Sequence, residues 1–509
     1  MRIERKWLNV ISMAYIYIPV CLFLMGWTRL LFAAVSIAVC AFCFCCFCWR
    51  DETDRGLQEK ITVDWVVLIF AILLFAWIGY CSGYGRFVNQ SSDWRKHNAI
   101  LQDLVQRDWP VLYFNNGEKS MLTYYIGQYL VPAAIGKALS SVRVAEVVLY
   151  IWNVLGLVLV FLNILIFTKA GTFLKQLVFA WMIPFFSIPL WLSQVLLQMV
   201  SEFDTLGAGQ WFYYADEIMI QYSNNYTLLR WVFPQTIPIW LMVVVFLLNK
   251  EKIRHYVFVL LPALLFGTIT FVGILPLTVG AAVENIFKTQ KTKEWLKQIF
   301  SAENIFMSLT LGMIVLFYFL GNVTGEKPEE IGFSVMQYTK ETIVIYVCFV
   351  MINILPYAIL LLKRHKSDLI YYVSILSLFI LPFFKMGMYN DLVMRASIPA
   401  LFVLMIYVVQ NLFVRVENYS ESIGARISLL ATIVLLMIGM HYPYMELTRS
   451  LKAEDYKVLG TGNDWDTLEW FADRSLEAVG VDVKYNYYSY DIDENFFCKH
   501  IMKRNGKSL

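Results

Sequence analysis

The sequence predicts an all-α polytopic integral membrane protein, with about 13 transmembrane helices, interfacial helices on the outer face and a small outer C-terminal tail. Of its 509 residues, 59% are hydrophobic and 16% charged, which is typical of multi-span membrane proteins and not of soluble enzymes. Apolar runs of about 20 residues recur along the chain, and basic residues fill alternate loops, as the positive-inside rule requires. The net charge of +3 gives no reason to expect a nucleic-acid partner, so the lipid bilayer is the expected one.

Residues 1–62 are predicted to form an N-terminal hairpin of two spans, 7–27 and 30–48. Basic residues before the first span and after the second place the N-terminus in the cytoplasm. Five cysteines lie in the second span, but neither an acid nor a histidine lies among them. Their spacing scatters them around a helix, so we interpret them as apolar side chains and not as a metal cluster.

Residues 63–287 form the next predicted unit, with outer loops 83–143 and 198–231. The span 63–82 crosses outward and carries the polar stretch 91–98 to the outer face. Segment 121–139 either spans or lies along the outer interface. The interfacial helix is preferred because tyrosine-rich amphipathic segments suit an interface and because Lys169 and Lys175 then lie in the cytoplasm. Residues 255–287 are expected to form a hairpin of two short helices that turns near 270–273.

Residues 288–442 contain five further predicted spans, at about 304–321, 342–363, 369–385, 396–413 and 427–442. The basic run at Lys363, Arg364 and Lys366 then lies in the cytoplasm, and residues 390–395 lie outside with Asp93. Residues 443–509 form the outer tail. The chain is therefore expected in the cell membrane, with a cytoplasmic N-terminus and a C-terminus on the outer face.

The polar stretch 91–98 supplies the first candidate groups. A carboxylate such as Asp93 could take a proton from an acceptor hydroxyl, with His97 at i+4 to orient it. Lys96 could hold a phosphate. The alternative is a solvated loop in which Asp93 only pairs with Arg95 or Lys96.

Other polar groups on the predicted outer side extend this set. Arg395 and Arg230 present guanidinium forks that match phosphate oxygens, although snorkelling anchors look the same in a sequence. Asp391 lies at i−4 from Arg395 and could form only an intrahelical pair. Serine-hydrolase elbows, P-loops, HExxH and dinucleotide fingerprints are absent from the sequence. No cofactor is predicted, and a divalent cation is left open.

The order of elements in 63–287 resembles the shared module of C-type (GT-C) glycosyltransferases. These multi-span enzymes use polyprenyl-phosphate sugars, as protein O-mannosyltransferases and aminoarabinose transferases do. The resemblance rests on an outward span, an outer loop with an early acid at Asp93 and a Tyr-rich interfacial helix. An inward span, a basic turn and an outward span with acids at its end complete it. The chain departs from the module in the added span 30–48 and in the single acid of the first loop.

The resemblance implies that Asp93 is the base or acceptor-binding group and that Asp204 is the acid after the third span of the module, although Asp216 competes with it. It implies a transferase that moves a sugar from a polyprenyl-phosphate donor to an acceptor hydroxyl on the outer face. A transporter or flippase of a lipid-linked saccharide is the alternative, and it would need polar or broken helices at mid-membrane depth. The predicted site residues are Asp93, Asp204 and His97 for catalysis, Arg395, Arg230 and Lys96 for the donor phosphate, and Asp216, Asn225, Asn390, Asp391 and Tyr124 for the acceptor or sugar.

Overall fold

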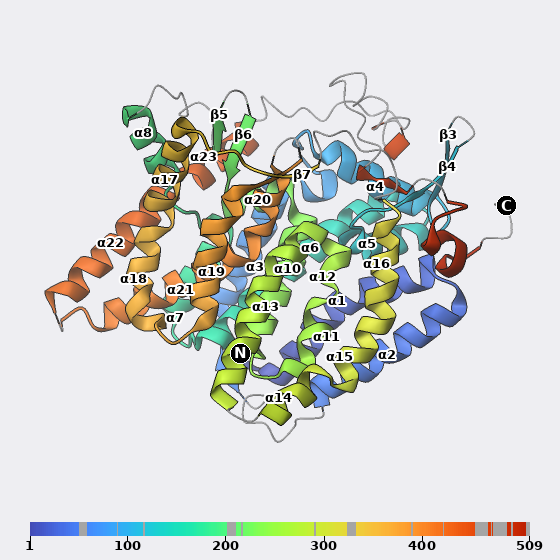
Figure 1. The fold of residues 1–509 in the computed structure, drawn as a ribbon, viewed down its shortest axis with the longest axis horizontal. Coiled ribbons are helices and arrows are strands. Elements are labelled where there is room, and N and C mark those ends of the chain that lie inside the picture. The colour runs from blue at the N-terminus through green and yellow to red at the C-terminus, as the bar shows by residue number, and fades with distance from the viewer. Residues whose placement is uncertain are drawn as a thin grey trace.

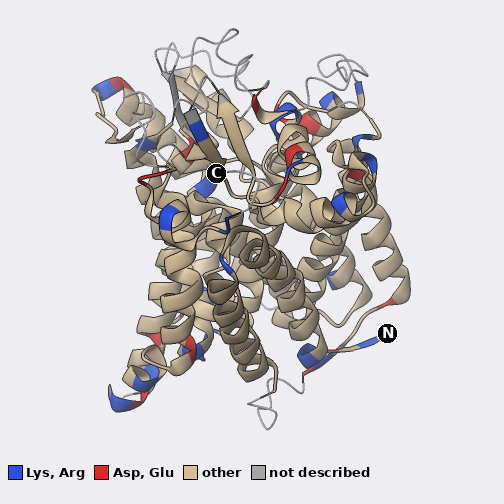
Figure 2. Ribbon diagram, turned by 90° about the vertical axis from the view of Figure 1, so that its right-hand side faces the viewer, with Lys and Arg blue, Asp and Glu red and all other residues tan. Residues whose placement is uncertain are grey.

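The computed structural model describes residues 1–49, 59–88, 90–115, 118–200, 210–214, 217–289, 292–322, 332–387, 390–420, 422–452, 467–469, 471, 486–489 and 492–504. These residues form a bundle of helices with short strands near one end (Figure 1). Within these residues, seven helices are long and apolar enough to cross a membrane. Two bent pairs of helices are also long and apolar enough when each pair is counted as one span, and four further apolar helices are shorter. Charged residues concentrate towards the two ends of the bundle (Figure 2).

The prediction of a mostly helical membrane protein is therefore confirmed. The apolar segments follow the order in which the spans were predicted, whereas the number of crossings and the GT-C type stay predictions.

The N-terminal segment forms a closed hairpin. Strand β1 (Arg2–Glu4) pairs antiparallel with β2 (Lys60–Thr62) and so ties the ends of the segment together. Between them lie α1 (Arg5–Trp27) and α2 (Leu30–Trp49). Helix α1 packs against α5 and α6, while much of α2 is exposed, as expected of a helix on the lipid-facing side. Within the described residues, no three His, Cys, Asp or Glu side chains are grouped so as to hold a metal.

The polar stretch 91–98 and the elements around it lie near the top of the bundle in Figure 1. They are η1 (Tyr84–Arg86), α4 (Trp94–Gln106), β3 (Leu112–Asn115), β4 (Glu118–Leu122) and α5 (Gly127–Ala138). The helix expected over 121–139 is shorter in the structure. Residues 121–122 are the end of strand β4, and helix α5 begins at Gly127. Its 12 residues extend about 18 Å, too short for the roughly 30 Å hydrocarbon core.

The next helices include one pair that is broken beside prolines. They are α3 (Trp65–Cys81), α6 (Val142–Thr168), α7 (Phe173–Phe185), α8 (Leu190–Val200), α9 (Asn225–Trp231) and α10 (Phe233–Leu248). The chain bends by 51° between α7 and α8, where Pro184 and Pro189 flank the break and remove backbone donors. Asp64 and Ser141 cap α3 and α6 by accepting backbone N–H groups. Helix α10 is buried on all sides and lies at the centre of the bundle.

The predicted hairpin at 255–287 is wrong in its turn and in its helix lengths. The chain forms η3 (Ile253–His255), α11 (Tyr256–Leu260) and α12 (Ala263–Phe266), and then a single long helix, α13 (Thr268–Thr289). The break is at Gly267, where a Cβ would lie 2.4 Å from Thr270 Oγ1. Gly273 has another use, since a Cβ there would lie 2.1 Å from the carbonyl oxygen of Ala396. It lets α13 approach the segment that carries Arg395.

The rest of the chain adds helices around a second central one, α21. The helices are α14 (Thr292–Ile299), α15 (Ala302–Met307), η4 (Ser308–Gly312), α16 (Met313–Leu320), α17 (Lys340–Asn353), α18 (Leu355–His365), α19 (Leu369–Ile380), η6 (Leu381–Phe383), α20 (Asp391–Ala396), α21 (Ile398–Glu417), α22 (Ile423–Gly439) and α23 (His441–Lys452). The apolar part of α20 and α21 is 94% buried, so this helix is enclosed by protein. Helices α17 and α18 meet at a 43° bend just before Pro356.

Short strands and the tail complete the end that carries α4. The strands are β5 (Trp211–Tyr214) with β6 (Glu217–Gln221), and β7 (Phe333–Val335) with β8 (Phe384–Met386). Strand β9 (Tyr488–Ser489) pairs with β4, so the tail joins a three-stranded sheet of order β3-β4-β9. After η8 (Phe497–Ile501), Met502 forms a β-bridge with Thr28. The described part of the tail is therefore packed on the end of the bundle.

Candidate functional site

The first turn of α4 is held by aromatic and hydrogen-bond contacts. The Trp94 indole Nε1 donates to the Ser82 carbonyl oxygen at 2.8 Å, and its ring stacks on Phe233 at 5.1 Å. The apolar positions of this amphipathic helix face the bundle. These contacts fix the position of Lys96 and of Asp93, which is the N-cap residue of α4, at the edge of the bundle.

His97 helps to anchor α4 in this way and does not orient the Asp93 carboxylate. It is 2% exposed, and its Nε2 donates to the carbonyl oxygen of Trp231 at 3.2 Å. Nδ1 must then accept from the Tyr129 hydroxyl, at 2.5 Å. Burial first, and then the Lys96 charge, lower the pKa of His97 to about 3. The imidazole is therefore neutral near pH 7, and it positions α4 through both ring nitrogens.

A group of charged and phenolic side chains gathers beside α4, and we name it the Asp93–Arg395 cluster. Three separate segments near α4 complete it: the chain after β4, helix α20 and the chain before β9. Its members are Asp93, Lys96, Tyr124, Tyr125, Asp391, Arg395 and Tyr487.

Two ion pairs and a tyrosine pair define the geometry of the cluster. Lys96 Nζ lies 2.5 Å from Asp93 Oδ2, and Arg395 Nη2 lies 3.0 Å from Asp391 Oδ1. Arg395 Nη1 donates to the Tyr125 hydroxyl at 3.2 Å, and that hydroxyl also accepts from Tyr124. Arg395 of α20 is thus joined through Tyr125 to the chain between β4 and α5.

The charges of the cluster act on one another. Burial raises the pKa of Asp93, but the Lys96 ammonium and the other positive charges near it, Arg395 among them, together outweigh burial, so that the pKa lies below its usual value. Burial lowers the pKa of Lys96, but the Asp93 carboxylate and the neighbouring phenols together outweigh burial and raise that pKa. Both side chains are therefore ionised at neutral pH.

Arg395 keeps N–H donors for a ligand, because its contacts with Asp391 and Tyr125 use two of its five. Its side chain is 13% exposed, and within the described part of the chain its buried Nε has no hydrogen-bond partner. A buried donor of this kind is costly unless something binds it. Asp93 is 36% exposed, so one edge of the cluster is open to solvent.

Tyr487 brings the tail into the cluster. Its ring lies 5.0 Å from that of Tyr124, and its carbonyl oxygen accepts the backbone N–H of Thr123 at 2.8 Å. Burial raises the pKa of its phenol, and the charges of Lys96 and Asp93 reach it. Sequence analysis did not identify Tyr125, Tyr129 or Tyr487 as site residues. The Tyr124-Tyr125 pair was the available signal for Tyr125, whereas nothing local marks Tyr487.

Two predicted site residues have structural partners elsewhere. Arg230 is 1% exposed, and its Nη1 lies 3.2 Å from Glu446 Oε1 on α23. The Asn225 side-chain amide donates to the Ile183 carbonyl oxygen at 2.7 Å, next to the break between α7 and α8. These contacts hold elements together and do not bring the two side chains into the cluster. Asn390 is buried and directly precedes Asp391, at the N-cap of α20 with a left-handed φ of 50°.

The two candidate acids of the second outer loop, Asp204 and Asp216, lie outside the described residues. Their predicted roles stay predictions. Among the described residues, Asp93 and Asp391 are the acids of the cluster, and each is paired with a cation.

The cluster combines groups that suit transfer to a hydroxyl from a phosphate-linked donor. An ionised carboxylate can accept a proton, and a lysine beside an arginine can stabilise a phosphate that carries charge as it leaves. Comparison of the chain with protein-family models, with curated proteins and with solved structures gives no match. The functional argument therefore rests on the chemistry of the cluster.

Proposed function

We propose that the protein is a membrane glycosyltransferase that moves a sugar from a polyprenyl-phosphate donor to an acceptor hydroxyl on the outer face of the membrane. The observation that carries the proposal is the Asp93–Lys96 ion pair of α4 together with the Arg395 guanidinium of α20, whose charge helps to lower the pKa of Asp93. Ionisable groups at the boundary of a membrane protein are costly, and they gather mainly where function requires them.

The proposed reaction assigns one task to each charged group. Asp93 takes the proton of the acceptor hydroxyl as the new C–O bond forms at the anomeric carbon. The bond between that carbon and the phosphate oxygen breaks, and its electron pair leaves with the polyprenyl phosphate. Lys96 and Arg395 stabilise this phosphate as it departs. The Tyr124, Tyr125 and Tyr487 hydroxyls line the same place and are available to the sugar or the acceptor.

A flippase or transporter of a lipid-linked saccharide is the second candidate. The observations that favour it are the bent pairs α7–α8 and α17–α18 and the break at Gly267, because broken helices often line transport sites. Gln235 adds to this: it is 1% exposed, and within the described residues its side-chain amide has no hydrogen-bond partner. The acid beside two cations favours the transferase, because moving an intact lipid needs no base.

The test is the Asp93→Asn variant. It keeps the size of the side chain and removes the basic oxygen, so the rate of sugar transfer should fall about 10²–10⁴-fold. Donor binding and protein level should change little, since Asp93 is partly exposed. The matched control is Asp493→Asn, in an exposed tail position, which should transfer sugar like the parent.

Two outcomes would count against the proposal. Undiminished transfer by Asp93→Asn would remove this carboxylate from the mechanism. Movement of a lipid-linked saccharide across vesicles by the parent, with no transfer to any hydroxyl, would instead favour the transporter.

A further inference from the structure

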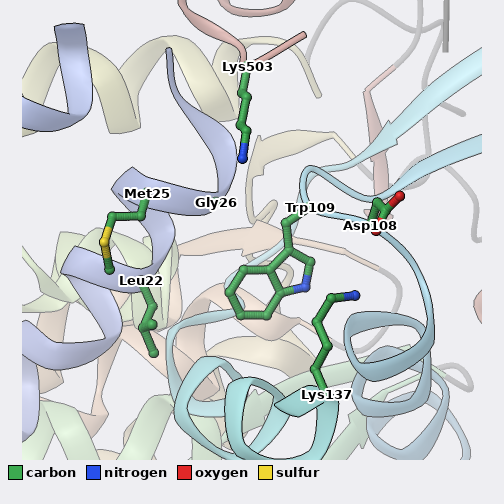
Figure 3. A pocket seen from close by; sticks show the side chains of 7 residues that line it. All are labelled: Leu22, Met25, Gly26, Asp108, Trp109, Lys137 and Lys503. Atoms are coloured by element: carbon green, nitrogen blue, oxygen red, sulfur yellow. The ribbon is translucent and has the colours of Figure 1, made fainter. Parts of the chain in front are cut away.

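A separate cavity of about 390 Å³ opens on the flank of α1 (Figure 3). The residues that line it are Leu22, Met25, Gly26, Asp108, Trp109, Lys137 and Lys503. Asp108 and Trp109 follow the C-terminal end of α4, whereas Asp93 is at the N-terminal end. Because α4 has 13 residues, its length of about 20 Å separates the cavity from the Asp93–Arg395 cluster.

One wall of the cavity is apolar and belongs to a helix that is long and apolar enough to cross a membrane. Met25 is 51% exposed and lies with Leu22 at the outer end of α1. The Trp109 indole forms the next wall and packs so closely on Gly26 that a Cβ there would lie 2.7 Å from the ring. An indole with one polar edge beside exposed apolar side chains is typical of the membrane–water boundary.

Two lysines from different parts of the chain line the cavity, and Trp109 lies between their ammonium groups in Figure 3. Lys137 Nζ donates to the Arg107 carbonyl oxygen at 2.6 Å and to the Val105 carbonyl oxygen at 3.5 Å, which fixes it at the end of α4 and leaves one N–H donor for a ligand. Lys503 is held by its backbone N–H, which donates to the Trp27 carbonyl oxygen at 2.9 Å. Asp108 also lines the cavity and lies on the side away from Lys503 in Figure 3.

We propose that this cavity binds the phosphate-bearing headgroup of an anionic membrane lipid. The Lys503 ammonium holds the phosphate, the Lys137 ammonium adds positive charge on the other side of Trp109, and an acyl chain runs along Leu22 and Met25. Basic pockets beside transmembrane helices suit such headgroups, and the adjacent apolar wall favours a lipid over a free anion. This site does not depend on the glycosyltransferase proposal. Because Lys503 belongs to the tail, a bound lipid would tie the tail to the membrane surface.

The experiment measures lipid retained by the purified full-length protein, with native mass spectrometry during titration with phosphatidylglycerol or phosphatidylcholine. The test variant is Lys503→Gln, which keeps the backbone hydrogen bond of that residue. The control is Lys119→Gln, which removes the same charge from an exposed position on β4, where Lys119 lies over the Phe114 ring.

We expect Lys503→Gln to weaken phosphatidylglycerol binding about fivefold, the effect of one lysine near an anionic lipid, and to leave phosphatidylcholine binding unchanged. Lys119→Gln should bind like the parent. Equal binding by Lys503→Gln and the parent would overturn the site, as would equal weakening by Lys119→Gln. Displacement of the lipid by equimolar inorganic phosphate would assign the cavity to a soluble anion, and competition by a polyprenyl phosphate would assign it to the donor.

Discussion

The role of Arg395 can be tested by removing its guanidinium or by replacing it with a simpler cation. In the structure, Nη2 contacts Asp391 at 3.0 Å and Nη1 contacts Tyr125 at 3.2 Å. The Nε N–H and the second N–H of each Nη are left for a ligand. Arg395→Ala removes both contacts and these donors, whereas Arg395→Lys keeps the positive charge and loses the planar fork.

The expected magnitude follows from the contact that the ligand would lose. A charge-assisted hydrogen bond contributes about 1.5–3 kcal/mol, so Arg395→Ala should weaken donor-lipid binding by about 10–150-fold. Arg395→Lys should recover only part of this, because a single ammonium cannot form two parallel hydrogen bonds to phosphate. The fold should tolerate both changes, since Asp391 is 34% exposed and can be hydrated when it loses its partner.

The assay is equilibrium binding of a polyprenyl-phosphate sugar to the detergent-purified protein, with monodispersity checked for each variant. Arg143→Ala is the matched control, because that arginine lies at the same end, is 52% exposed and pairs with Glu146 at 2.9 Å. It should bind donor like the parent. Parental affinity in both Arg395 variants would mean that the residue is an anchor, and the phosphate site would have to be sought elsewhere.

Three further predictions concern His97, Tyr487 and the topology. Because the pKa of folded His97, about 3, lies below the unfolded value of about 6.5, only the unfolded chain binds this proton between those values, and stability is lost as the pH falls through that window. In denaturation experiments in detergent, the free energy of unfolding of the parent should fall by about 2 kcal/mol more than that of His97→Gln between pH 6.5 and 5. Equal losses in the two proteins would contradict the assignment of a neutral, buried imidazole. Tyr487→Phe keeps the ring on Tyr124 and removes the hydroxyl, so donor or acceptor binding should weaken about 2–10-fold. The control Tyr444→Phe, at a position 67% exposed, should have no effect on binding. If Tyr487→Phe binds with parental affinity, the tail is not part of the site. Cysteines placed at Lys169 and Lys119, in a background without accessible native cysteines, should react with an impermeant thiol reagent from opposite sides, and labelling of both from one side would refute the proposed topology.

The helices were predictable because their signal is local. An apolar run long enough to cross a bilayer must satisfy its backbone internally, and in a chain of this composition a helix does so. Length alone could not predict which of these helices the protein itself encloses. Helices α10 and α21 are surrounded by other helices, whereas α2 and α22 keep large exposed faces, and their sequences are similarly apolar.

Breaks and turns were less predictable because glycine serves two purposes. Gly267 and Gly273 are both plausible turn residues in the segment 255–287. Only the packing distinguishes them, since Gly267 ends α12 while Gly273 makes room for the Ala396 carbonyl oxygen. A single sequence does not say what lies opposite a glycine.

The candidate site was predictable to the extent that its contacts are local. Asp93 with Lys96 and Asp391 with Arg395 are three and four residues apart, and both pairs form. Arg230 was an equally good candidate from its position at a membrane boundary, but Glu446 lies far along the chain and could not be identified as its partner. His97 has the spacing of a partner for Asp93, yet its ring nitrogens are used by Tyr129 and Trp231.

Local pairing alone does not distinguish a working site from two surface ion pairs, because an acid and a base at helical spacing would pair in any exposed helix. The distinction lies in the contacts between segments. Arg395 reaches the Tyr125 hydroxyl, its charge lowers the pKa of Asp93, and Tyr487 covers the Tyr124 ring. Burying the two cations, Lys96 and Arg395, beside their partly exposed acids costs desolvation that two separate surface pairs would avoid. That cost is the physical reason to propose a function for the Asp93–Arg395 cluster. The Arg230–Glu446 pair, which Arg449 and the Trp231 indole also contact, bears a similar cost and joins α9 to α23.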